Sequence, residues 1–301
     1  MENAEMLRDR EFDESWKKVL EKYFWPFLEF YFPEMAAQID QAEGYSFLDQ
    51  ELSAVSRKAD TKKRRLDKLA KVYLKDHREM WLLIHVEIQS YKDTEFALRM
   101  MQYHYRIYDL YEKPVASVAI LADPDPEFRP NSFATQAFGE TYLRFQFKIA
   151  KILDWEGRER ELENNSNPFA VVTLASLKTY EKDCEKRFSF KYNLTKMLYE
   201  RGYSGKMILA LYEFLDGIMV LPEEMEREYE ERIVRYEEEC QMPYITTAER
   251  IGMEKGLLKG MEKGMEKGME KGMEKGVRQS LLEILQMKFG AVPEDIVAQI
   301  D

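Results

Sequence analysis

Residues 66–90 read LDKLAKVYLKDHREMWLLIHVEIQS, and this stretch decides the fold class. Its two ends, residues 66–74 and 81–90, are apolar, β-branched or aromatic runs of strand length. The polar segment KDHREM lies between them, which predicts a β-hairpin with a loop of about five residues. A turn centred on His77 places Asp67 directly opposite Glu87, with their Cβ atoms roughly 5 Å apart.

Side chains alternate along a strand, so Gln89 and His85 share the face of Glu87. The other face of the second strand carries residues that suit a core, namely Leu82, Ile84, Val86 and Ile88. The pattern therefore predicts a polar face on one side of the hairpin and an apolar face on the other.

Two opposed carboxylates destabilise a strand pair, and a divalent cation between them removes that penalty. Mg²⁺ typically takes one or two protein carboxylates and keeps several waters, which suits phosphodiester hydrolysis. The alternative is a solvent-exposed hairpin edge whose acids are neutralised by neighbours such as Lys68 and Lys71. The residue pattern of the hairpin leaves both readings open.

The flanking segments predict helices on both sides of further strands. Residues 12–40 are rich in aromatics and predict a core-facing helix that ends near Pro33, and a second short helix is predicted around Ser46–Val55. Helical spacing returns at residues 94–112, before Pro114. Residues 115–121, VASVAIL, have the continuous apolar pattern of a buried central strand, and residues 142–153 form one strand or two short ones. The order of these elements predicts an α/β fold.

After residue 156 the pattern is helical, with helices at 168–180 and 204–220 and an acidic one at 222–240. From Gly252 the chain repeats a tetrapeptide, GMEKGLLKGMEKGMEKGMEKGMEKG. Four residues make slightly more than one helical turn, so the glycines form a row along which two helices can approach closely. We therefore expect a core at residues 1–155, a helical extension at 156–240 and a repeat tail at 241–301.

The chain has 301 residues, a net charge of −11 and 45% hydrophobic residues. This composition indicates a folded chain and argues against a broadly basic surface. No apolar stretch reaches the roughly 20 residues of a membrane helix, and the N-terminus lacks the features of a signal peptide. We therefore expect a cytoplasmic protein that does not bind membranes.

Seven basic residues nevertheless lie within twelve positions directly around Asp67: Arg57, Lys58, Lys62, Lys63, Arg64, Arg65 and Lys68. A local basic cluster of this kind can contact phosphates, and a solvated loop is the simpler explanation. On the helix at 94–112, Arg99, Tyr103 and Arg106 can reach phosphate or can pack. His104 is expected on that helix's surface.

Four segments carry a family resemblance: FLDQEL, RRLDKLAKVYLKD, WLLIHVEIQSYKD and FALRMMQYHYRIYDLY. Together they resemble the recombination-promoting nuclease and transposase-like branch of the PD-(D/E)XK superfamily over most of the first 155 residues. Asp67, Glu87 and Gln89 match the active-site Asp, Glu and Gln of that branch. Glu51 matches an acidic residue that helps to hold or orient the metal.

The resemblance implies a restriction-endonuclease-like core and a DNA endonuclease that uses Mg²⁺, with Mn²⁺ as a substitute. The DNA-binding residues would be Arg57, Lys62, Lys63, Arg64, Arg65 and Arg99. Gln89 stands where the wider superfamily has lysine, and an uncharged amide implies slower cleavage. The competing hypothesis is a non-enzymatic protein that binds DNA on a degenerate nuclease fold, or that forms homo-oligomers through the repeat tail.

Overall fold

The computed structural model of the protein describes residues 12, 14–49, 52, 66–87, 95–179, 181–240 and 290, with the backbone alone at residues 66, 67 and 85–87. The chain divides into two compact units, Met1–Met242 and Pro243–Asp301. Apart from Gly290, every described residue belongs to the first unit.

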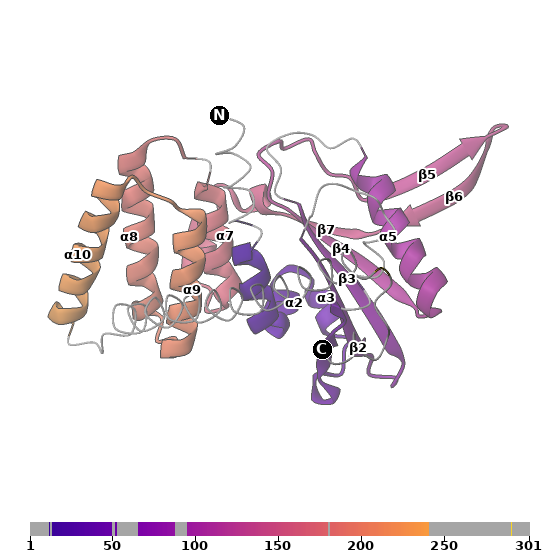
Figure 1. The fold of residues 1–301 in the computed structure, drawn as a ribbon, viewed down its shortest axis with the longest axis horizontal. Helices are drawn as coiled ribbons and strands as arrows, with labels where there is room; N and C mark the ends of the chain where they lie inside the picture. Colours follow the sequence, from indigo (N-terminus) through magenta and orange to yellow (C-terminus); the bar gives the residue numbers. More distant parts are fainter. Residues whose placement is uncertain are drawn as a thin grey trace. The chain divides into compact units, whose positions relative to one another are not determined.

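A mixed five-stranded sheet forms the centre of the first unit (Figure 1). The strand order is β1-β2-β3-β4-β7, with bounds Tyr45–Phe47, Leu66–Tyr73, Glu79–Glu87, Val115–Leu121 and Lys148–Lys151. The pairs β1–β2 and β2–β3 are antiparallel, and the pairs β3–β4 and β4–β7 are parallel. Helices lie on both sides of this sheet, so the predicted α/β class is confirmed.

Strand β4 has the bounds that the sequence predicted, because its apolar run suits a position buried on both faces. Its last five residues are buried. The crossover between the parallel strands β3 and β4 contains helix α5, Phe96–Tyr111, within the predicted range 94–112. Pro114 lies between α5 and β4, as the stop signal predicted.

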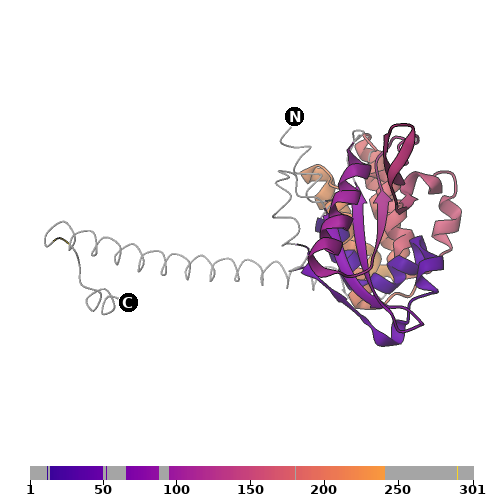
Figure 2. The same ribbon diagram turned by 90° about the vertical axis from the view of Figure 1, so that its right-hand side faces the viewer.

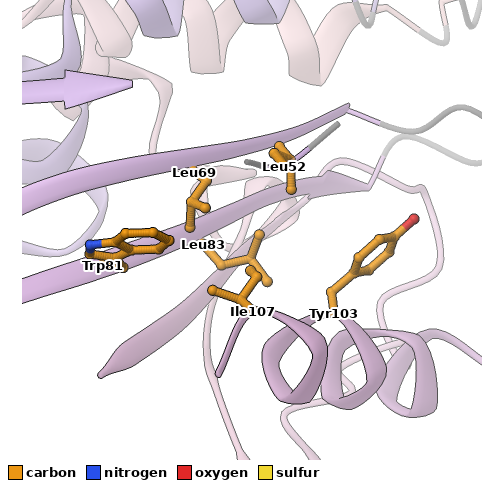
Figure 3. Packing of buried hydrophobic residues seen from close by; sticks show 6 residues of the cluster. All are labelled: Leu52, Leu69, Trp81, Leu83, Tyr103 and Ile107. Carbon is orange, nitrogen blue, oxygen red and sulfur yellow. The ribbon is translucent and has the colours of Figure 1, made fainter. Parts of the chain in front are cut away.

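Helix α5 covers one face of the sheet. Figure 3 shows Tyr103 and Ile107 of α5 against Leu69 of β2 and Leu83 of β3, in a cluster that also contains Leu52 and Trp81. A second cluster continues along the helix with Phe96, Met100, Ala119, Leu121, Phe128 and Phe147. The helix is amphipathic, and its apolar stripe follows β2, β3 and β4.

The opposite face is covered by N-terminal helices. Residues 14–22 are helical, and α2 (Phe24–Tyr31) and α3 (Pro33–Ala36) follow, so the helical segment breaks at Pro33 as predicted. The Phe24 ring packs on Tyr45 and Phe47 of β1, with ring centroids 4.4 and 5.6 Å away. The helix predicted at Ser46–Val55 is wrong at its start, because Tyr45–Phe47 pairs with β2 instead.

Helix α2 also joins the sheet to a helical bundle. Helix α7, Pro168–Lys178, is buried on all sides, as expected for an apolar helix inside a core. Asn167 caps it at the Phe169 amide (2.9 Å) and donates to the Pro26 carbonyl (2.9 Å), and Tyr31 bonds Thr173 (2.6 Å). The short helices η1, η2 and α6 span Gln41–Glu43, Ile152–Trp155 and Glu159–Glu163.

Three further helices complete the bundle: α8 (Cys184–Glu200), α9 (Gly205–Ile218) and α10 (Glu223–Glu239). Lys191 of α8 is buried and lies 2.8 Å from Asp216 of α9 and 2.6 Å from Glu226 of α10. Its ammonium also lies 4.6 Å from the ring centroid of Tyr229. The acidic helix α10 is therefore held to the bundle by a buried cation as well as by its apolar stripe.

Between β4 and β7 the chain forms a separate two-stranded ribbon, β5 (Ser132–Ala137) and β6 (Glu140–Gln146). The strands predicted at 142–153 correspond to β6 and β7, whereas β5 was not predicted. Among the helices of the described segments, none is long and apolar enough to cross a membrane.

Candidate functional site

The β2–β3 hairpin pairs Asp67 with His85, so Asp67 does not lie directly opposite Glu87. The predicted register is wrong by two residues. The cause is the turn, because its three-residue loop, Lys75 to His77, is centred on Asp76 instead of His77. Leu74 donates to the Arg78 carbonyl (2.8 Å), and His77 donates to the Leu74 carbonyl (2.8 Å) with a φ of 64°. A turn followed by a left-handed residue closes hairpins of this length.

A shift of two residues preserves the face of every position, because strand side chains alternate with a period of two. Positions 67 and 85 oppose each other, and position 87 follows on the same face of β3. Diagonal neighbours of this kind are roughly 7–8 Å apart. The backbone register thus brings Asp67 and Glu87 together diagonally. Gln89 and Glu51 lie outside the described residues.

The expected division into a polar and an apolar face is also wrong. Leu69, Trp81 and Leu83 share the face of positions 67 and 85, and all three are buried against α5. Leu82 and Ile84 are buried on the other face. Strand β3 is internal to the sheet and has helices on both sides, so both faces are apolar over most of its length. The predicted site lies only at the end of the strand.

That end of β3 coincides with the carboxyl ends of the other parallel strands. Glu87 is level with Leu121, the last residue of β4, and Leu121 is level with Lys151, the last residue of β7. Antiparallel β2 begins at the same edge, with Asp67 as its second residue. In open α/β sheets, ligands bind outside the carboxyl ends of parallel strands.

A buried ion pair, Asp123 with Lys151, occupies this edge, and the sequence alone did not reveal it. The Lys151 ammonium lies 2.6 Å from Asp123 Oδ1, and the two side chains are 0% and 4% exposed. Lys151 also lies 3.4 Å from the Phe128 carbonyl oxygen. The sequence contains only two signals of this ion pair, which are an acid directly after an apolar strand and a lysine within an apolar run.

The two Asp123 oxygens have different surroundings. Oδ1 accepts from Lys151 and from the Asp125 amide (3.0 Å). Oδ2 is buried and has no hydrogen-bond partner among the residues that the structure describes. Burial raises the pKa of the Asp123 carboxyl above its ordinary value, although Lys151 and the Asp125 amide both lower it.

Lys68 does not belong to an exposed basic cluster. It is 3% exposed and forms ion pairs with Glu21 (2.5 Å) and Asp49 (2.8 Å), and its ammonium lies 5.0 Å from the Phe47 ring centroid. Its charge is therefore directed to the face of β2 opposite that of position 67. Arg57, Lys58, Lys62, Lys63, Arg64 and Arg65 lie outside the described residues.

The sequence predicted phosphate contact or packing for Arg99, Tyr103 and Arg106 of α5, and a surface position for His104. Arg106 is half-buried. Arg99 stacks on Phe96, with its guanidinium carbon 5.4 Å from the ring centroid. Tyr103 is buried in the core, so it packs. His104 is not a plain surface residue, because its Nδ1 lies 3.1 Å from Ser117 Oγ and its ring lies 4.8 Å from Phe145. Burial lowers the pKa of His104.

The opposite end of the hairpin carries another group of potential ligands. Asp40, Glu43 and His77 have ligand atoms within 4.8 Å of one another. Asp40 already accepts from the Ala42 amide (3.1 Å), and Glu43 and His77 are exposed. This group lies at the loop end of β2 and β3, away from the edge that carries Asp67 and Glu87.

The geometry therefore gathers Asp67, Glu87, Asp123 and Lys151 at one sheet edge. Comparisons with models of protein families, with curated proteins and with solved structures found no match to this chain.

Proposed function

We propose that the protein is a Mg²⁺-dependent DNA endonuclease with a PD-(D/E)XK core. The observation that supports this most is the backbone register, in which Asp67 and Glu87 occupy neighbouring strands, one face and the carboxyl edge of the parallel strands. The resemblance of the flanking segments supports the same residues. In this proposal Asp67 and Glu87 hold the ion, and Glu51 helps to hold or orient it.

The donor set suits this ion. Carboxylate oxygens are the ligands that Mg²⁺ prefers, and it is typically bound through one or two of them. Lys68, the cation next to Asp67 in the chain, is paired with Glu21 and Asp49, so it leaves the repulsion between the two acids for a bound cation to relieve. When bound, Mg²⁺ polarises a phosphoryl oxygen and acidifies its water.

The other residues position the substrate. Gln89 orients the attacking water through neutral hydrogen bonds, and slow cleavage follows because an amide supplies no positive charge beside the phosphate. The basic residues Arg57, Lys62, Lys63, Arg64 and Arg65, together with Arg99, contact the DNA backbone without reading its sequence. The proposal implies a cytoplasmic protein that acts in DNA recombination.

Nicking of supercoiled plasmid by the full-length chain, with Mg²⁺ or Mn²⁺, tests the proposal. Asp67→Asn and Glu87→Gln should each lower the nicking rate by about 100-fold or more, since even outer-shell partners of a metal site typically contribute 10–100-fold. Asp40→Asn and His77→Ala are matched controls at the loop end of the same hairpin, and both should nick at the wild-type rate.

Wild-type nicking by both carboxylate variants, or a requirement for Asp40 and His77, would show that the site is misplaced. A protein that binds plasmid without nicking it supports the non-enzymatic alternative. Titration calorimetry with Mg²⁺ then separates the two cases, because a degenerate site shows no heat that depends on Asp67 and Glu87.

A further inference from the structure

Large hydrophobic side chains that are exposed to solvent gather in one region of the described structure. Among the described residues eight such side chains are exposed, and six of them belong to α5 or to the β5–β6 ribbon. The six are Tyr105, Tyr108, Leu110, Phe138, Tyr142 and Leu143, which together we call the ribbon surface. Scattered exposed hydrophobic residues are ordinary, whereas a concentration of them marks an interaction site.

The tip of the ribbon is the least expected part of this surface. Phe138 and Gly139 form a two-residue turn with φ of 53° and 82°, and positive φ at both positions is what a type I′ turn requires. Asparagine, aspartate or glycine normally occupies the first position, and a bulky residue there is an outlier. Phe138 is also 95% exposed, so folding alone does not account for it.

The ribbon and α5 are neighbours that contact each other at the base of the ribbon. Strands β5 and β6 pair only with each other, and the ribbon projects beyond the central sheet (Figure 1). Its base packs on α5, where the Phe145 ring lies 4.8 Å from His104, and Figure 2 shows the ribbon and α5 on the same side of the unit. A two-stranded ribbon is marginally stable by itself, so a partner that covers it also stabilises it.

The charges of the ribbon surface favour a second copy of the chain over DNA. Glu140 and Arg144 balance each other on the ribbon, which contains no lysine, and α5 has Asp109 against Arg99 and Arg106, so the two elements together carry one net positive charge. DNA-binding surfaces are strongly basic. A surface this close to neutral instead lets two chains, each with a net charge of −11, meet with little repulsion.

The area also fits a dimer. A large side chain covers about 200 Å², so the exposed fractions of the six residues amount to about 700 Å². A standard protein interface buries about 800 Å² on each partner, and tyrosine, phenylalanine and arginine are enriched in it. With its immediate neighbours, the ribbon surface reaches the size that a specific interface needs.

We propose that the ribbon surface is a two-fold dimer interface, in which Phe138 at each ribbon tip inserts against α5 of the second copy. A two-fold interface uses the same patch on both chains. Tyr105 and Tyr108 then provide the aromatic wall that receives the tip. This inference does not depend on the proposed nuclease activity, nor on association through the repeat tail.

Sedimentation equilibrium of the full-length chain tests this interface. The variant Phe138→Asn/Tyr108→Gln removes two aromatic anchors and keeps the fold, since asparagine before glycine is the preferred type I′ pair and glutamine favours helices. The dimer Kd should rise by about 100-fold, as expected for the loss of two interface anchors. Val220→Ser is the matched control, because Val220 is exposed outside the surface, and its dimer Kd should equal that of the wild type.

The proposal would be overturned if the wild-type chain were monomeric at about 50 μM, a concentration at which even weak specific association is detected. A double variant that associates as tightly as the wild type would also overturn it, because association would then reside elsewhere, for example in the repeat tail. If the double variant keeps the wild-type mass in sedimentation but no longer binds plasmid, the ribbon surface contacts DNA and the dimer proposal is refuted.

Discussion

Replacing Lys151 by methionine tests how the carboxyl edge of the sheet is held together. Lys151→Met leaves Asp123 as a buried carboxylate without its countercharge, at a site where both side chains are almost completely shielded from water. Breaking a buried pair from one side typically costs about 3–5 kcal/mol. For a domain of this size, each kcal/mol corresponds to roughly 2–4 °C, so the unfolding midpoint should fall by about 10 °C.

The loss should depend on pH in a definite direction. Burial already raises the pKa of Asp123, and removing the lysine raises it further. The folded variant then binds a proton that the unfolded chain releases near pH 4, so its stability falls as the pH rises through the raised pKa. The destabilisation should be largest at neutral pH and should shrink in acid.

Urea and thermal unfolding of three variants provide the assay. Lys151→Met/Asp123→Asn removes both charges and should recover more than half of the loss, because a neutral amide no longer needs a countercharge. Lys148→Met is the matched control on β7, since its ion pair with Glu34 is exposed and should leave the midpoint unchanged. A Lys151→Met midpoint within 2 °C of wild type, or a double variant as unstable as the single one, would refute the reasoning; 2 °C corresponds to less than about 1 kcal/mol.

Three further predictions concern other parts of the chain. Because burial lowers the pKa of His104 below 6.5, stability should be lost as the pH falls from 6.5 through the lowered pKa, and a pH series of unfolding midpoints should show that His104→Gln lacks this component. Asp183 accepts from the Glu185 amide (3.0 Å) at the start of α8, so Asp183→Ala should cost about 1 kcal/mol in urea unfolding, and an unchanged midpoint would contradict its role as a cap. If the proposed function holds, Gln89→Lys should raise the plasmid nicking rate by roughly tenfold, because it adds a cation beside the phosphate, and a slower variant would argue against Gln89 next to the attacking water.

Much of the fold could be predicted from local patterns. The apolar run at Val115–Leu121 and the helical spacing around Phe96–Tyr111 each report burial directly, and both elements formed at the expected positions. The common face of Asp67 and Glu87 was also predictable, since alternation along a strand survives a register error of two.

Contacts between distant residues could not be predicted in the same way. The true register depends on a three-residue loop in which His77 adopts a left-handed conformation, and the residue types in the loop do not predict that conformation. Tyr45–Phe47 becomes a strand only because β2 offers an unpaired edge beside it. The pairing of Asp123 with Lys151 spans 28 residues and required both strand ends to meet.

The amino-acid sequence by itself determined most of the helices and strands, with β1 and β5 as exceptions, and which backbone positions share a strand face, because hydrophobic periodicity acts over a few residues. Only the tertiary structure decided which strand ends meet at the carboxyl edge, that Lys68 pairs away from Asp67, and that a ribbon projects with Phe138 at its tip. These features depend on loop closure and on burial between distant segments, and no local pattern encodes either one.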